Sequence, residues 1–152
     1  MEKKRIVLAS DHAGFPLKQA LIGSLREAGY DAIDVGTHSE ESCDYPIYAE
    51  KGCRALLAGD ADLCILCCGT GIGMSIAANK IKGIRAAAVS DVFSARYTRM
   101  HNDANVLCLG SRVIGVGLAW ELVEAFVTAE FEGGKHARRV DEIRSLEENG
   151  TL

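Results

Sequence analysis

A cysteine followed by a glycine-rich turn is the feature of the sequence best suited to chemistry. The apolar run 63–68 has the length of a buried strand and ends at Cys68. A helix-like apolar segment, 74–79, follows the turn, so backbone N–H groups at a helix start can face an anion. A thiolate at such a place could act as a nucleophile or a base, and the alternative is a cysteine that only fills the core. The turn itself reads Gly69-Thr70-Gly71-Ile72-Gly73.

Two nucleotide-binding interpretations of this turn fit poorly. In the dinucleotide fingerprint G-x-G-x-x-G, Gly69 and Gly71 fill the first two places but Met74 fills the third. The turn also follows the third predicted strand, whereas the fingerprint belongs after the first. No Lys-Ser/Thr pair follows, which excludes a nucleotide P-loop. Two alternatives stay open: a tight turn whose glycines serve only geometry, and a loop whose amides hold an oxyanion or enediolate.

Polar residues follow two other predicted strands. Asp11 and His12 come after the strand 6–9, and Arg112 follows the strand 105–109. Ligands of parallel sheets bind outside the carboxyl ends of the strands, so these side chains should lie near Cys68. Arginine suits a phosphate through paired hydrogen bonds. The Asp-His pair could equally be a helix cap or a surface hydrogen bond.

His101 and Asn102 precede the last predicted strand instead of following it. They should therefore lie at the opposite end of the sheet, and could serve the site only from a helix ending near its rim or from a second subunit. A basic run after Gly133-Gly134 is either a solvated helix face or a phosphate-binding group. It comprises Lys135, His136, Arg138 and Arg139.

Composition limits the class of protein. The 152 residues are 48% hydrophobic and 25% charged, as in a soluble globular domain, and the net charge of −4 disfavours nucleic-acid binding. No apolar run reaches the ~20 residues that span a membrane, and the start is too short for a signal peptide, so we expect a cytoplasmic protein. Cys64 and Cys67 form a C-x-x-C pair, but on a strand they point to opposite faces, which argues against a metal or disulfide role.

Strand and helix signals alternate five times along the chain. The predicted strands are continuous apolar runs, as in sheets covered on both faces. The sequence therefore predicts one domain over 1–152: a Rossmann-like three-layer α/β sandwich with a five-stranded parallel sheet and an extra C-terminal helix. The expected strands are 6–9, 32–35, 63–68, 84–89 and 105–109, and the expected helices are 16–28, 46–58, 74–79, 91–100, one around 118–126, and 135–148.

Taken together, the motifs resemble the ribose-5-phosphate isomerase B family, whose wider group includes allose and galactose 6-phosphate isomerases. The resemblance runs from residue 6 to about 146, and the set of motifs is specific although each is weak alone. The motifs are Ser10-Asp11-His12-Ala13-Gly14, Asp44-Tyr45-Pro46, Cys68-Gly69-Thr70-Gly71-Ile72-Gly73, Ser75-Ile76-Ala77-Ala78-Asn79-Lys80, Gly83-Ile84-Arg85-Ala86, His101-Asn102-Asp103-Ala104-Asn105-Val106, Gly110-Ser111-Arg112 and Phe131-Glu132-Gly133-Gly134.

The resemblance implies aldose–ketose isomerisation of a sugar phosphate through an enediolate, with no metal and no cofactor. It implies that Cys68 is the base, that Thr70 and the loop amides stabilise the enediolate, and that His101 opens the sugar ring. Asp11 would contact sugar hydroxyls and move protons between oxygens. It also implies a homodimer, possibly a tetramer, whose pockets draw on two chains. The remaining implied substrate contacts are Tyr45, His12, Asn102, Arg112, Lys135, Arg139 and the loop residues Gly69, Gly71, Ile72 and Gly73.

One position departs from the family pattern. Lys135 stands where relatives often have arginine, and lysine keeps the charge but lacks the two-pronged guanidinium. The sequence therefore leaves pentose and hexose phosphates open as substrates. A non-catalytic sugar-phosphate-binding subunit is a further alternative, disfavoured because Cys68, Thr70 and His101 are all present.

Overall fold

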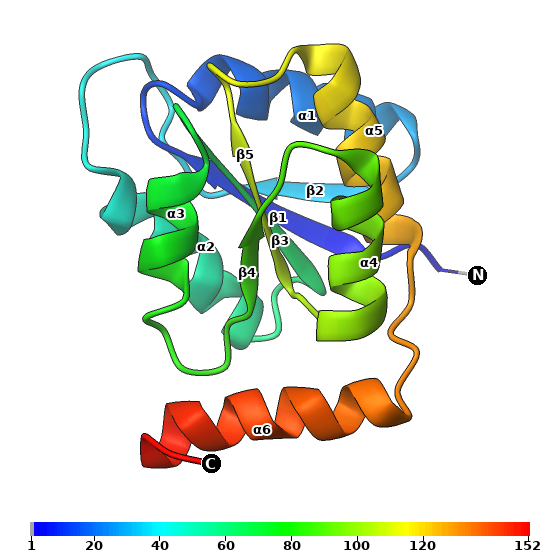
Figure 1. Ribbon diagram of the computed structural model, residues 1–152. Helices are drawn as coiled ribbons and strands as arrows, with labels where there is room; N and C mark the ends of the chain where they lie inside the picture. The colour runs from blue at the N-terminus through cyan, green and yellow to red at the C-terminus, as the bar shows by residue number, and fades with distance from the viewer. Residues whose placement is uncertain (1) are drawn as a thin grey trace.

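Five parallel strands form the centre of the molecule. The computed structural model describes residues 2–152, and its sheet has the order β2-β1-β3-β5-β4 (Figure 1). All four strand pairs are parallel. The strands are β1 (Arg5–Ser10), β2 (Asp31–Asp34), β3 (Leu63–Cys68), β4 (Ala86–Ala88) and β5 (Val106–Gly110). The predicted Rossmann-like sheet is confirmed.

Helices cover both faces of the sheet. One buried apolar cluster joins the sheet to α1, α4 and α5, and a second joins its other face to α2 and α3 (Figure 1). The helices are α1 (Phe15–Glu27), α2 (Tyr45–Leu57), α3 (Ile72–Ala78), α4 (Val92–Asn102), α5 (Val116–Thr128) and α6 (Lys135–Asn149). Among the described residues, no helix is both long and apolar enough to cross a membrane.

The C-terminal helix α6 lies outside these layers. It runs across the amino-terminal end of the sheet and is separated from α5 by an irregular segment (Figure 1). Only Val140 of this helix is buried, whereas Ile143 and Leu146 remain about half exposed. The helix is therefore held to its own chain by little apolar packing.

The alternation of side chains along β3 agrees with the sequence analysis. Cys67 packs into the cluster under α1 and α5, while Cys64 packs into the cluster under α2 and α3. Burial raises the pKa of Cys53 to about 11 and also raises that of Cys64. These thiols are unreactive core residues, and all six cysteines are free.

Several boundaries differ from the predicted ones by one or more residues, and three of these differences have a clear cause. The strand predicted at 84–89 is only Ala86–Ala88, because it lies at the sheet edge and Ile84 instead packs in a turn, its N–H bonded to the carbonyl of Ile81. Helix α3 begins at Ile72, two residues early, since Gly71 takes the left-handed conformation that starts it. Helix α4 begins after Asp91, whose carboxylate accepts the Ser94 N–H at 2.7 Å.

Candidate active site

The carboxyl ends of β1, β3 and β5 lie side by side and carry most of the predicted site residues. The backbones approach so closely here that side chains would not fit. A Cβ on Gly14 would lie 2.2 Å from the carbonyl oxygen of Cys67, and one on Gly110 would lie 2.6 Å from that of Thr70. Glycine at both positions lets the β1 and β5 loops pack against the turn that follows β3.

Cys68 is the last residue of β3. The residue is only 4% exposed, and its Sγ accepts a hydrogen bond from the N–H of Gly71 at 3.1 Å. A backbone N–H in this position can donate to the sulfur of a thiol or of a thiolate. The turn therefore folds back over the sulfur that it follows.

The glycine turn is shaped by two further contacts. Thr70 Oγ1 accepts the N–H of Ile72 at 3.2 Å and lies on the exposed side of the turn. The ring of Tyr45, at the start of α2, packs so closely on Gly73 that a Cβ there would lie 2.8 Å from the ring. Tyr45 and the turn thus form one wall of the site at the carboxyl ends of the strands.

Asp11 and His12 lie beside this wall but are partly engaged within the protein. Asp11 is buried, and its Oδ1 accepts the N–H of Gly14 at 2.9 Å, so one carboxylate oxygen caps the turn into α1. His12 Nδ1 accepts the N–H of Cys43 at 3.1 Å. In a neutral ring this leaves the proton on Nε2, which can donate to an anion.

Arg112 follows β5 and lies against the turn. Its backbone N–H donates to the carbonyl of Gly69 at 3.0 Å. A Cβ on Gly69 would lie 3.4 Å from Nη1 of the arginine, so the side chain covers the start of the turn. Because the guanidinium is exposed, its donors are free for a phosphate.

His101, Asn102, Lys135 and Arg139 are not brought to this edge in a single chain. His101 and Asn102 end α4, near the start of β5, and the two basic residues lie in the first turns of α6. The structure thus gathers the predicted residues into two groups at opposite ends of the sheet. The position of His101 agrees with the sequence analysis, which expected it away from Cys68.

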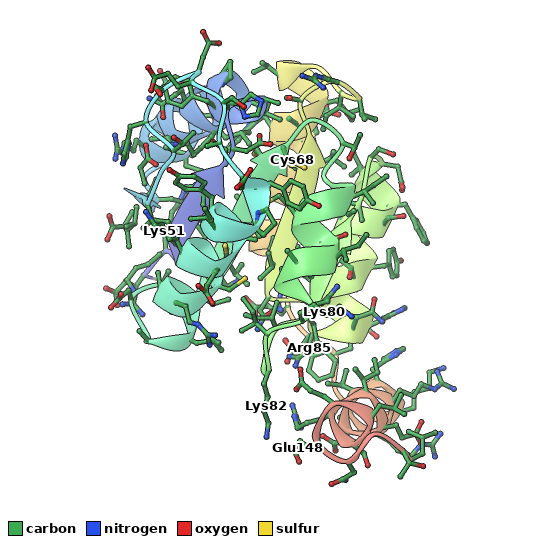
Figure 2. The ribbon with its side chains drawn as sticks, turned by 90° about the vertical axis from the view of Figure 1, so that its left-hand side faces the viewer. Lys51, Cys68, Lys80, Lys82, Arg85 and Glu148 are labelled. Atoms are coloured by element: carbon green, nitrogen blue, oxygen red, sulfur yellow. The ribbon has the colours of Figure 1, made fainter. Side chains whose placement is uncertain are left out.

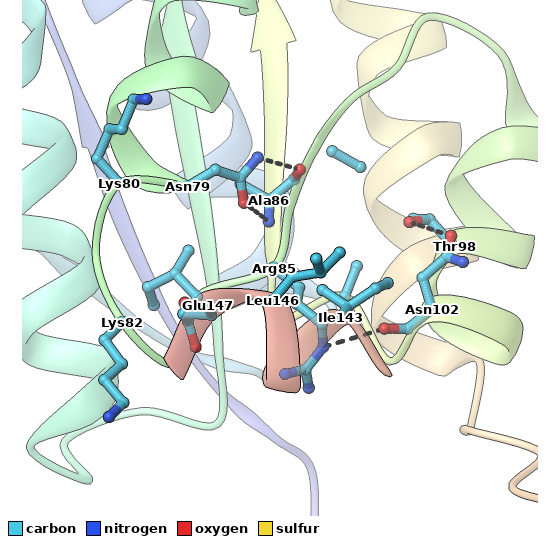
Figure 3. Close-up of a pocket in the computed structure, with 13 residues that line it drawn as sticks. Asn79, Lys80, Lys82, Arg85, Ala86, Thr98, Asn102, Ile143, Leu146 and Glu147 are labelled. Carbon is cyan, nitrogen blue, oxygen red and sulfur yellow. Dashed lines mark hydrogen bonds between the residues drawn. The ribbon is translucent and has the colours of Figure 1, made fainter. Parts of the chain in front are cut away.

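A hollow of about 750 Å³ opens at the end of the sheet that carries Asn102 (Figure 3). Its polar side includes Asn102, whose Oδ1 accepts from Thr98 Oγ1 at 3.2 Å, and Arg85. Ile143 and Leu146 of α6 form its apolar side. Figure 2 shows Cys68 and Arg85 far apart along the strands, so this hollow is not the space beside the thiol.

Comparison with known proteins gives the family. The family model described as Ribose/Galactose Isomerase matches residues 6–143. The chain belongs to this family. Ribose-5-phosphate isomerase B of Escherichia coli is 48% identical over 145 residues, which cover 95% of this chain and 97% of that protein.

Solved structures of family members agree with the fold. Ribose-5-phosphate isomerase B of Clostridium thermocellum is 47% identical with a TM-score of 0.94, covering 97% of this chain and 99% of that one. The Mycoplasma genitalium enzyme, solved with bound ribulose-5-phosphate, is 39% identical with a TM-score of 0.89, covering 95% of this chain and 97% of that one.

Two features of this isomerase-family chain were missed by sequence reasoning. Lys18 is fully buried and forms an ion pair with Asp34 at 2.5 Å. The sequence signal that could have indicated this burial is the position of the lysine beside the apolar residues of α1. Glu132 lies 3.7 Å from His101 and 3.5 Å from His136. The i,i+4 spacing of Glu132 and His136 is the sequence signal that could have indicated the second contact.

Proposed function

We propose that this protein interconverts ribose 5-phosphate and ribulose 5-phosphate. The relatives of high identity that bear this activity in their names support the substrate. The observation that carries the reaction is the amide of Gly71 donating to the Sγ of Cys68. A sulfur held in this way at the carboxyl end of the sheet, next to Asp11 and an exposed Arg112, suits removal of a proton from a carbon beside a carbonyl.

The proposed reaction is a proton shuttle between two carbons. In the open-chain sugar, the Cys68 thiolate takes the proton from C2, and the electron pair of that bond forms the double bond of an enediolate. The resulting thiol returns the proton to C1, while the proton of the C2 hydroxyl passes to the C1 oxygen, a transfer that we assign to Asp11. This gives the ketose and restores the thiolate. The charge on oxygen needs preorganised donors, for which Thr70 and the amides of the turn are placed.

The remaining groups come from a second copy of the chain. Neither group of site residues is complete alone: one has the thiol and Arg112, and the other has His101, Lys135 and Arg139. A two-fold axis can bring the first group of one chain to the second group of its partner, and does so twice. In this homodimer the partner's His101 opens the sugar ring, and Asn102 lies beside it.

Exposed apolar side chains support the same assembly. Ile72 and Ile76 on α3 and Phe93 on α4 are each more than half exposed, and these helices flank the edge strand β4 (Figure 1). Large apolar residues gathered around an unpaired sheet edge are typical of a protein–protein interface. We place the dimer contact there.

Phosphate binding belongs to both groups in this proposal. His12 and Arg112 approach it from the chain that carries the thiol, and Lys135 and Arg139 approach it from the partner. A hexose 6-phosphate is the second candidate substrate. Lys135 leaves that alternative open, because it offers a point charge where arginine would fix the phosphate with two bonds.

We extend the proposal to the chain as a whole and its location. Residues 1–152 form one sugar-phosphate isomerase domain. Six free cysteines suit the reducing cytoplasm, where thiols remain unpaired.

Replacement of the base tests the function. Cys68→Ala should abolish conversion of ribose 5-phosphate while binding of the sugar phosphate, measured by calorimetry, is retained. Cys53→Ala, which removes a core thiol remote from the turn, is the matched control and should keep turnover. A fully active Cys68→Ala enzyme would refute the assigned base. The ratio of kcat/KM for ribose 5-phosphate and allose 6-phosphate decides between the two substrates.

A further inference from the structure

Two histidines and a glutamate form a cluster at the junction of α4 and α6. His101 ends α4, Glu132 lies in the segment before α6, and His136 lies in the first turn of α6. One ligand atom from each of the three side chains lies within 4.8 Å of the other two. Within residues 2–152 this is the one set of three such side chains with that spacing.

The distances from Glu132 to the two histidines are close to those between neighbouring ligands of a tetrahedral metal ion. The Oε2 of Glu132 lies 3.7 Å from Nε2 of His101 and 3.5 Å from Nε2 of His136. With zinc–ligand bonds of ~2.0–2.1 Å, neighbouring ligands of a tetrahedron stand about 3.4 Å apart. Two imidazoles and one carboxylate are a donor set that zinc takes, with water in the fourth place.

Solvent reaches all three side chains of the cluster, and those of His101 and His136 are 36% and 13% exposed. The carboxylate of Glu132 is 42% exposed, so an ion can reach it from solvent.

The orientation of the two rings predicts how an ion would bind. His101 and His136 stack with centroids 3.9 Å apart and an angle of 9° between their planes. Parallel rings point their nitrogen lone pairs side by side, so a shared ion requires one ring to turn. Apart from the contacts with Glu132, the ring nitrogens of the two histidines make no hydrogen bond within the described residues, which permits this turn.

From this geometry we propose that His101, Glu132 and His136 form an inhibitory binding site for Zn²⁺. The ion joins the end of α4 to the start of α6, a helix whose only buried residue is Val140. It therefore fastens α6 to the body of the chain. It also occupies the nitrogen of His101, which can then neither accept nor deliver a proton. The binding itself is independent of the proposed isomerase activity, whereas the inhibition rests on it.

Calorimetric titration with ZnCl₂ tests the binding. The wild-type protein should bind one ion per chain, and Glu132→Gln should weaken binding at least tenfold. Glu130→Gln is the matched control, since that carboxylate is two residues away and pairs with Lys4 instead. Cys43→Ser controls for the one thiol that is not buried, which lies 4.0 Å from His12. Equal affinity in the wild type and Glu132→Gln, or loss of binding in Cys43→Ser, would overturn the site.

The isomerase assay then separates the site from its consequence. Turnover by the wild type should fall over the same Zn²⁺ concentrations as binding and return on addition of a chelator. The turnover of Glu132→Gln is expressed relative to its own metal-free rate. This variant should need at least tenfold more Zn²⁺ than the wild type for the same fractional inhibition. Binding without inhibition would keep the metal site and refute the role of His101, so the two proposals fail in different ways.

Discussion

The buried Lys18–Asp34 pair provides the sharpest test of how the loop before α2 is held. The ammonium of Lys18 donates to Asp34 Oδ1 at 2.5 Å and to the carbonyl of Thr37 at 2.7 Å, and the lysine is fully buried. Thr37 in turn donates its N–H to the carbonyl of Ser10, the residue before Asp11. Lys18 therefore connects α1 to the loop that carries Cys43, the partner of His12.

Replacing the lysine should cost a large fraction of the stability. Removing one partner of a buried ion pair costs ~3–5 kcal/mol. Asp34 is 19% exposed, and in Lys18→Met its Oδ1 would still accept the hydrogen bond from the N–H of Gly36 at 2.9 Å. The lower end of this range therefore applies to Lys18→Met. At ~2–4 °C per kcal/mol for a chain of this size, a loss of about 3 kcal/mol lowers Tm by about 6–12 °C.

Thermal unfolding followed by circular dichroism at one protein concentration measures this loss. Lys51→Met is the matched control, because Lys51 is exposed and its removal should change Tm little. Lys18→Met/Asp34→Asn should recover part of the loss, since no buried carboxylate then stays unpaired. A loss below about 1 kcal/mol for Lys18→Met would refute the reasoning.

Two further predictions concern the turn and the surface. Gly110→Ala should lower kcat/KM by about tenfold or more with unchanged circular dichroism, because its Cβ would lie 2.6 Å from the Thr70 carbonyl oxygen and displace the turn. In Gly115→Ala, where nothing lies within 4 Å, activity should persist, and equal activity of the two variants would contradict the prediction. Lys4 holds the pKa of Glu130 below its ordinary 4.5, so this pair stabilises the fold above that pH and loses its effect as pH falls through the lowered pKa. Urea unfolding should therefore show Glu130→Gln weakened by a few tenths of a kcal/mol at pH 7 and little at pH 3; the same difference at both values would contradict it.

The sequence predicted the alternation of strands and helices along the chain better than the order of the strands in the sheet. Strands such as β3 are continuous apolar runs, which periodicity detects directly, and Pro16 marks the first turn of α1 as expected. The position of β4 beyond β5 could not be predicted, because a parallel crossover can reach either a neighbouring or a more distant strand. β4 itself was predicted too long, since an edge strand pairs on one side only and its apolar neighbour Ile84 is buried in a turn.

The sequence predicted the location of those site residues that directly follow the end of a strand. Cys68 and Arg112 follow the ends of adjacent parallel strands, so topology alone brings them together. The contacts of Glu132 with His101 and His136 depend on where α6 docks, which no local pattern encodes. The burial of Lys18 depends likewise on a loop more than fifteen residues away in sequence, since its partner carbonyl is that of Thr37.

Mixing two inactive variants tests most directly whether one active site combines Cys68 with the partner's His101. Cys68→Ala and His101→Asn should each be inactive, but a hybrid dimer would contain one site with both residues intact. After random exchange of subunits at equal amounts, half of the dimers are hybrids, and the mixture should regain about one quarter of wild-type turnover. No recovery, despite hybrids demonstrated by native mass spectrometry, would contradict a site shared between chains.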